Sequence, residues 1–243
     1  FHESFAGMSA SAVWYLNMPA GTGGQWQLTG IDPGAQDGDG GYAEFAPTLS
    51  GDSFTLLSEK IVVSGAKPLL SFWYYSIDTD DELRVSVIPT GGNAPIEAVF
   101  PIAGGKGWTE ADIDLRSLKG KTLQILFSYQ TVGNRGAHVL LDNIRVDQGR
   151  LNNLSAVEIT APEKVYAGAE YTVGVKVRNS GMDPADGYRI VLYRDGERIS
   201  EMSGERIKPF STAIVEFPEK ATLFFSDMTS YHAAIEFDTD EDI

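Results

Sequence analysis

Apolar and polar residues alternate with a period of two along much of the chain, which is the pattern of β-strands rather than helices. The most informative stretch is 67–87. Residues 69–75 form a short run crowded with aromatic side chains, which predicts a strand buried in the middle of a sandwich. Residues 82–87 alternate polar and apolar positions and predict a half-buried antiparallel strand. An acidic turn containing Asp78, Asp80 and Asp81 joins them, so we expect a buried hairpin.

The rest of the chain consists of further short strand-like segments separated by turns rich in glycine and aspartate. The predicted strands are 1–5, 25–30, 42–45, 54–63, 96–102, 111–115, 123–129 and 138–146, followed by 154–159, 171–177, 189–193, 198–202, 212–217 and 230–237. Residues 6–24 read as a loop in which Trp14 and Tyr15 cap the core. Asp195 and Gly196 stand between two alternating segments, which is a strong signal for a two-residue hairpin turn.

No stretch keeps a helical period over three or four turns, so the chain is predicted to be all-β and built of antiparallel sandwiches. A polar, turn-rich segment at 147–154 reads as a linker between two domains. We therefore expect one β-sandwich domain over residues 1–149 and a smaller immunoglobulin-like sandwich over residues 150–243.

The composition excludes several classes of function. The 243 residues carry a formal net charge of −15, which disfavours nucleic acids and anionic membrane surfaces as partners. The chain has no cysteine, which excludes disulfide scaffolds, thiolate nucleophiles and cysteine-ligated metal sites. No apolar run is long enough for direct membrane insertion. Because the chain starts at Phe1 on strand-like sequence, we expect that an upstream segment has been removed.

The first half resembles MAM domains and the cleaved-adhesin domains of gingipain-type bacterial peptidases, which are jelly-roll sandwiches. The segments that carry the resemblance are 3–5 (ESF), 38–42 (GDGGY), 57–61 (LSEKI), 70–74 (LSFWY), 107–108 (GW) and 141–144 (LDNI). Residues 70–74 match the family most closely. The cysteines of MAM domains are absent, and Ala6 stands where the opening motif has its second acidic residue. The resemblance implies a jelly-roll, concanavalin-like fold for residues 1–149.

The second half is similar to CARDB and related immunoglobulin-like modules of bacterial surface proteins. The matching segments are 175–181 (VKVRNSG), 191–196 (VLYRDG) and 235–242 (IEFDTDED). In that family one more strand follows the acidic loop. The resemblance therefore implies that residues 150–243 lack the last strand of the domain and that the chain is part of a longer protein with further domains.

Four carboxylates of the first half are candidate ligands for a structural calcium ion. Asp37 and Asp39 lie in a glycine-rich loop, Glu3 on the first strand and Asp142 on the last. Calcium prefers several oxygen ligands from carboxylates and carbonyls. The first and last strands of a jelly roll are neighbours, so we expect Glu3 and Asp142 to meet, and the resemblance adds weight because such folds often hold a cation there. The alternative is that the loop aspartates only form turns.

Aromatic side chains offer a second candidate site, for a glycan. The aromatic residues able to stack on sugar rings are Trp14, Trp26, Tyr42, Trp73, Tyr75 and Trp108. We select Trp26 and Trp108, which stand near glycines and loops, as exposed ligand-binding residues. Phe72 and Trp73 point to opposite faces of one strand, and for Trp73 the sequence favours packing in the core.

Catalytic motifs are sparse. Ser128, His138 and Asp142 suggest a triad, but no nucleophile elbow surrounds the serine, which lies within a predicted strand. No phosphate-binding or dinucleotide-binding glycine motif stands in the required strand–helix context. We therefore expect no enzyme, but a secreted or cell-surface bacterial adhesion module whose ligand is an extracellular protein or a glycan. The competing hypothesis is an accessory, carbohydrate-binding part of a larger secreted peptidase or glycoside hydrolase.

Overall fold

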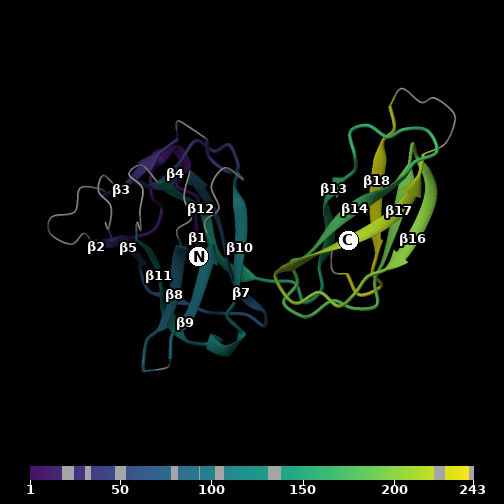
Figure 1. The fold of residues 1–243 in the computed structure, drawn as a ribbon. Coiled ribbons are helices and arrows are strands. Elements are labelled where there is room, and N and C mark those ends of the chain that lie inside the picture. The colour runs from purple at the N-terminus through teal and green to yellow at the C-terminus, as the bar shows by residue number, and fades with distance from the viewer. Residues whose placement is uncertain are drawn as a thin grey trace. The chain divides into compact units, whose positions relative to one another are not determined.

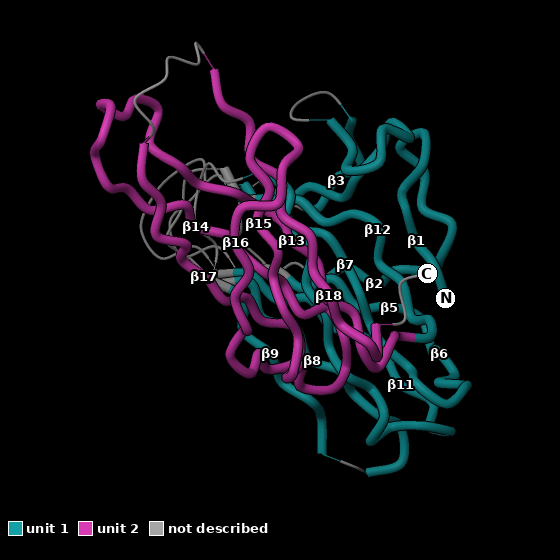
Figure 2. Tube along the Cα trace, turned by 90° about the vertical axis from the view of Figure 1, so that its right-hand side faces the viewer, with its two compact units in different colours: residues 1–148 teal, residues 149–243 magenta. Residues whose placement is uncertain are grey.

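The computed structural model describes residues 1–17, 25–30, 34–46, 53–77, 82–92, 94–101, 107–130, 138–221 and 228–240. The chain divides into two compact units, Phe1–Gln148 and Gly149–Ile243 (Figure 2). Both are built of antiparallel strands. The acidic turn at Asp78, Asp80 and Asp81 lies outside the described residues.

The first unit is a sandwich of two sheets, visible as two layers in Figure 1. Sheet A has the order β10-β7-β12-β4-β3, with β1 beside β12; sheet B has the order β2-β5-β11-β8-β9, with β6 beside β11. The strands of sheet A are β1 (His2–Glu3), β3 (Gln25–Thr29), β4 (Tyr42–Ala46), β7 (Pro68–Ile77), β10 (Thr109–Asp114) and β12 (His138–Gln148). Those of sheet B are β2 (Trp14–Asn17), β5 (Ser53–Ser58), β6 (Ile61–Val62), β8 (Glu82–Pro89), β9 (Ile96–Pro101) and β11 (Thr122–Gln130). This is the predicted jelly-roll sandwich, with two short 3-10 turns at Ala6–Met8 and Arg116–Leu118.

The stretch 67–87 forms the two expected strands but not the expected hairpin. β7 pairs with β10 and β12 in sheet A, whereas β8 pairs with β9 and β11 in sheet B. The chain therefore crosses from one layer to the other between them. Alternation of side chains specifies which face of a strand is buried, but it does not specify which strand is the neighbour, and this explains the wrong pairing.

The core of the first unit fills the space between the sheets. Aromatic rings dominate its centre: Phe72 contacts Phe100 and Phe127 edge to face, with ring centroids 5.3 and 5.1 Å apart. Phe45 and Tyr129 meet in the same way at 4.9 Å. Such T-shaped pairs are the favoured arrangement of ring quadrupoles, so the strand faces that carry these rings are held firmly against each other.

The N-terminal segment contributes one strand that the sequence pattern did not predict. Residues 14–17, expected to be loop, form β2 at the edge of sheet B, paired with β5. Trp14 does cap the core, as expected, with its ring 6.0 to 6.3 Å from those of Phe1, Phe5 and Phe127. Tyr15, its neighbour, is 55% exposed.

The second unit is a smaller sandwich with an immunoglobulin-like arrangement of two three-stranded sheets, β13-β14-β17 and β16-β15-β18. The strands are β13 (Leu154–Thr160), β14 (Glu170–Asn179), β15 (Arg189–Arg194), β16 (Glu197–Ser203), β17 (Ser211–Lys220) and β18 (Tyr231–Glu236). The hairpin predicted at Asp195 and Gly196 is confirmed: both residues have positive φ, 51° and 84°, as a two-residue turn between twisted strands requires.

The side chain of Asn179 connects loops at one end of the second unit through hydrogen bonds. Asn179 is fully buried at the end of β14, and its Nδ2 donates to the carbonyl oxygens of Asp183, Ile207 and Lys208 at 2.9 to 3.3 Å. Its Oδ1 accepts a hydrogen bond from the backbone N–H of Gly181. A buried amide satisfied in this way fixes several loop segments at once.

Among the described residues of the chain, no helix is long and apolar enough to cross a membrane.

Candidate functional site

Sheet A carries aromatic side chains on its outer side as well as in the core. Along β7 the side chains alternate: Leu70, Phe72 and Tyr74 are buried in the core, whereas Trp73 and Tyr75 point outward and are half-buried. The prediction that Trp73 belongs to the core is therefore wrong. The reason is the strict alternation of the strand, because Phe72 occupies the inner position next to it.

Trp108, just before β10, joins this outer side. Its ring lies 5.7 Å from that of Tyr75 and 5.9 Å from that of Tyr42, both in edge-to-face geometry. Its Nε1 donates to the backbone oxygen of Gly34 at 3.1 Å. Tyr42 and the neighbouring Leu140 are almost completely buried on this side of the sheet. Trp108 is thus half-buried rather than exposed as predicted, and three separate contacts hold it in place. Its role in ligand binding stays a prediction.

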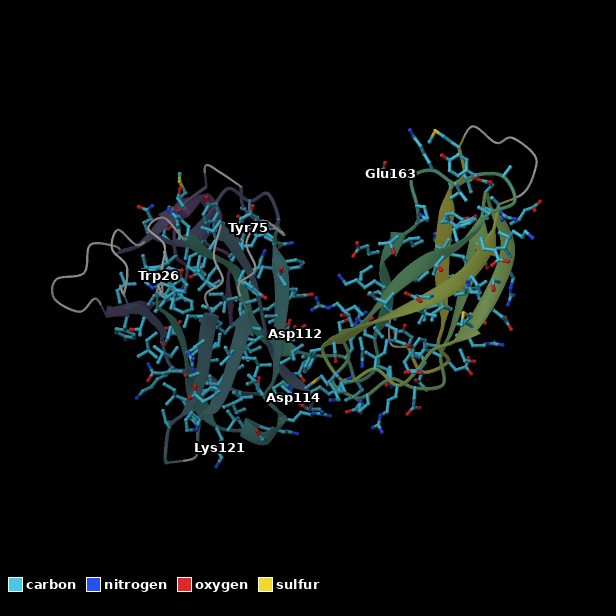
Figure 3. All side chains as sticks on the ribbon, in the orientation of Figure 1. Trp26, Tyr75, Asp112, Asp114, Lys121 and Glu163 are labelled. Carbon is cyan, nitrogen blue, oxygen red and sulfur yellow. The ribbon has the colours of Figure 1, made fainter. Side chains whose placement is uncertain are left out.

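Charged and polar groups surround these rings. On one side, Glu44 accepts hydrogen bonds from Gln27 Nε2 at 2.8 Å and from His138 Nδ1. On the other, Glu110 accepts one from Arg145 at 3.2 Å, and it pairs across the strands with Trp73. We call the set Trp73, Tyr75, Trp108, Glu44, His138 and Glu110 the aromatic face. Figure 3 shows Tyr75 and Asp112 on the same side of the first unit, on β7 and β10.

Trp26 does not belong to the aromatic face. It is only 7% exposed, and its ring packs on Phe45 in the core at 5.6 Å. The expectation of an exposed Trp26 is therefore wrong. Side chains alternate along β3, and Trp26 takes the inward position whereas Gln27 takes the outward one. The alternation of the strand, and not the nearby glycines, therefore decides that the ring of Trp26 is buried.

Asp142, Asn143 and the loop before β4 form a polar cluster. Asp142 is fully buried, and its two oxygens accept hydrogen bonds from the backbone N–H groups of Gln36 and Asn143 at 2.8 and 2.7 Å. The side-chain amide of Asn143 donates to Gln36 Oε1 at 3.0 Å and to Asp37 Oδ2 at 2.9 Å. His2 Nε2 contacts Asn143 Oδ1 at 3.1 Å. Asn143 adopts a left-handed conformation with φ of 48°, which asparagine tolerates better than most residues.

The pKa values of the two carboxyl groups in this cluster, Asp142 and Asp37, shift in opposite directions. Burial raises the pKa of Asp142 to about 6, against the hydrogen bonds from Gln36 and Asn143, and the charges of Asp37 and Asp39 add to the increase. Burial also acts to raise the pKa of Asp37, but the hydrogen bonds from Asn143 and Asp39 outweigh it and leave that pKa below its usual value. Asp39 is connected to the cluster through its backbone N–H, which donates to Asp37 Oδ1 at 3.0 Å.

Glu3 lies elsewhere. β1 does pair with β12 as expected, with Glu3 opposite Ile144, so Glu3 faces the same way as this core residue. Its carboxylate accepts hydrogen bonds from the N–H groups of Phe5 and Ala12 and from Trp14 Nε1, at 2.9, 2.7 and 3.2 Å. Asp142 instead pairs with Trp73, on the outward side. The expected meeting of Glu3 and Asp142 does not occur, because a β-bulge between Asp142 and Arg145 inserts one residue and reverses the facing of the strand.

The donor chemistry of the polar cluster suits a hard cation only in part. Carboxylate oxygens of Asp37 and Asp142 and amide oxygens of Gln36 and Asn143 are of the type that calcium prefers. In the part of the chain that the structure describes, however, no three acidic or histidine side chains converge closely enough to hold a metal ion. A structural calcium ion thus stays a prediction, with Asp37, Asp39 and Asp142 as the residues that would bind it; the carboxylate of Glu3 lies outside this cluster.

The residues of the suggested triad are not assembled. Ser128 is on β11 in sheet B, whereas His138 and Asp142 are on β12 in sheet A. His138 contacts Glu44, and Asp142 is bonded to backbone N–H groups. With the serine and the histidine in different layers of the sandwich, the geometry that nucleophilic catalysis needs is not present among them.

Two family models match this chain, and several solved structures are similar to it. The family CARDB matches residues 151–243. Among solved structures, the K3 cleaved adhesin domain of Lys-gingipain from Porphyromonas gingivalis is similar at 16% identity and a TM-score of 0.44, covering 61% of this chain and 98% of that domain. TmCBM61 in complex with β-1,4-galactotriose is similar at 16% identity and a TM-score of 0.46, covering 56% and 88%. The family 11 carbohydrate-binding module from Clostridium thermocellum follows at 14% identity and 0.40, covering 60% and 95%.

All three TM-scores are below 0.5, so nothing about this chain is argued from these likenesses. A comparison with curated protein sequences gave no match. The MAM domain family (meprin/A5/mu) matches residues 7–150, more than half of the chain and almost the whole of the first unit. The chain therefore belongs to the MAM domain family.

Proposed function

We propose that the first unit is a non-catalytic binding module of an extracellular or cell-surface protein, with the aromatic face as its ligand surface. The second unit would serve as a spacer that connects this module to further domains of the same parent chain. The ligand is an extracellular protein or a glycan.

The observation that carries the proposal is the outward position of Trp73, Tyr75 and Trp108. Large aromatic side chains normally end in the core, and here the same strand already supplies Phe72 to it. Aromatic residues gathered at the surface and rimmed by polar groups are characteristic of interaction sites. Regular strands position two of the rings, so the surface is preorganised and binding would cost little ordering of the protein.

A solid-phase binding assay tests the proposal. The full chain is applied to immobilised collagen, fibronectin and mucin and to a set of immobilised polysaccharides, and wild type is compared with Trp73→Ala and Tyr75→Ala. We expect the wild type to bind at least one of these surfaces and both variants to bind it more weakly. The control is Tyr15→Ala, which removes an equally large, 55% exposed ring from β2 of the other sheet. Binding that Trp73→Ala and Tyr75→Ala leave intact would place the ligand surface elsewhere.

A further inference from the structure

The aromatic face combines aromatic rings with charged and polar side chains, and this combination limits the class of ligand that it can bind. From the chemistry of the face we infer that the ligand is a neutral polysaccharide, bound with the C–H faces of its sugar rings on Trp73, Tyr75 and Trp108 and with its hydroxyl groups on Glu44, His138 and Glu110. This inference rests on the proposed function and deepens it, because it chooses one of the two ligand classes.

The rings supply the apolar half of the recognition. The face of an aromatic ring carries partial negative charge, and the C–H groups on one side of a pyranose carry partial positive charge, so the two stack favourably. Tyr75 and Trp108 are fixed relative to each other at a centroid distance of 5.7 Å. Buried Tyr42 and Leu140 lie in the adjacent strands of the same side, so the rings rest on an apolar floor and keep their orientation.

The polar groups supply the other half. Each carboxylate oxygen has two acceptor sites, so Glu44 retains acceptor capacity beyond its contacts with Gln27 and His138. Glu110, bonded to Arg145, places a second carboxylate beside Trp73. When His138 donates its Nδ1 proton to Glu44, its Nε2 is left as an acceptor on a ring that is 33% exposed. Sugar hydroxyls are donors as well as acceptors, and they satisfy such groups without burying an unpaired charge.

A protein ligand suits this face less well. The centres of protein interfaces are depleted of aspartate and glutamate, because a carboxylate covered by another protein loses its hydration. Here Glu110 stands directly opposite Trp73 across the strands, and Glu44 lies opposite Leu140, so no large apolar ligand could cover the rings without covering the acids. A hydroxyl-rich ligand removes this conflict.

Negative charge around the aromatic face disfavours the binding of acidic glycans. Asp112 follows Glu110 on the same side of β10. Among the described residues on this side of sheet A, the carboxylates of Glu44, Glu110 and Asp112 stand beside Arg145, which is paired with Glu110. The chain as a whole has a net charge of −15. Uronates and sulfated sugars would meet like charge, which costs affinity and slows association.

Affinity electrophoresis of the full chain tests the inference. Native gels contain either a neutral polysaccharide (a mixed-linked β-glucan, a galactan or a mannan) or an acidic one (polygalacturonate or heparin). We expect at least one neutral polysaccharide to retard the wild type and neither acidic one to do so. Tyr75→Ala and Trp73→Ala should weaken the retardation about tenfold each. Tyr15→Ala, on β2 of the other sheet, should bind as wild type.

The outcomes separate this inference from the function on which it rests. Collagen or fibronectin binding that depends on Tyr75, with no neutral polysaccharide bound, would overturn the glycan inference and retain the binding module. Retardation by the acidic polysaccharides alone would overturn it as well. Binding of neither class, or binding that is indifferent to Trp73 and Tyr75, would overturn both. A cooperative urea transition of Tyr75→Ala, followed by tryptophan fluorescence, shows that a loss of binding is not a loss of fold.

Discussion

The adjacent residues Phe72 and Trp73 should respond to truncation in opposite ways. Phe72 is fully buried and contacts the rings of Tyr74, Phe100 and Phe127. Phe72→Ala leaves a cavity among rings that cannot collapse together, and we expect it to lower the free energy of unfolding by about 3–5 kcal/mol. Trp73 is half-buried on the outward side, so Trp73→Ala should cost about 1 kcal/mol in stability but weaken ligand binding about tenfold.

Urea denaturation followed by tryptophan fluorescence measures both effects. All four tryptophans, Trp14, Trp26, Trp73 and Trp108, lie in the first unit, so the signal reports on that unit alone. With a slope of about 2 kcal/mol per M urea, Phe72→Ala should move the midpoint by about 2 M and Trp73→Ala by about 0.5 M. Equal destabilisation by the two substitutions would show that Trp73 is a core residue and would refute the assignment of the aromatic face.

Three further outcomes follow from the polar groups. The folded-state pKa of Asp142, about 6, lies above its ordinary value of 3.8. The contribution of Asp142 to the free energy of unfolding should therefore fall by about 3 kcal/mol as the pH rises from about 4 to about 6. Urea midpoints measured in EDTA should show this fall in the wild type and lack it in Asp142→Asn. Calcium should raise the melting temperature of the wild type and leave that of Asp142→Asn unchanged, and no shift in the wild type would show that hydrogen bonds alone hold the cluster. Asn179→Ala should destabilise the second unit by about 2–3 kcal/mol, seen by circular dichroism, while the tryptophan-reported transition stays in place; an unchanged circular dichroism transition would contradict the role of this amide.

The strands of this protein were largely predictable because their sequence signals are local. The period-two alternation of β7 and the turn at Asp195 and Gly196 act over a few residues, and both lead to the observed structure. The partner of each strand is a non-local property. β7 and β8 follow each other along the chain and yet belong to different sheets, since a jelly roll carries the chain back and forth between its layers.

The candidate sites were less predictable for the same reason. The carboxylates of Glu3 and Asp142 are on neighbouring strands, as expected, and a single inserted residue at Asn143 turns them to opposite sides. Nothing in the composition of that segment distinguishes a bulge from a regular strand. Gln36 and Asn143, which hold the polar cluster together, were missed because uncharged amides carry no local signal for such a role.

The aromatic residues of β7 differ in role between the inner and the outer face of the strand. A run of aromatic residues in a sandwich strand is usually taken as evidence of burial on both sides. In this strand the inner rings, Phe72 and Tyr74, hold sheet A against sheet B, and the outer ones, Trp73 and Tyr75, are half-buried on the opposite side. The strength of the core is therefore what positions the outer rings, since the backbone that carries them cannot shift without disturbing Phe72. A ligand surface built on such a strand is rigid, and its affinity should depend on the identity of the outer rings and on the Gly34 contact that holds Trp108 in place.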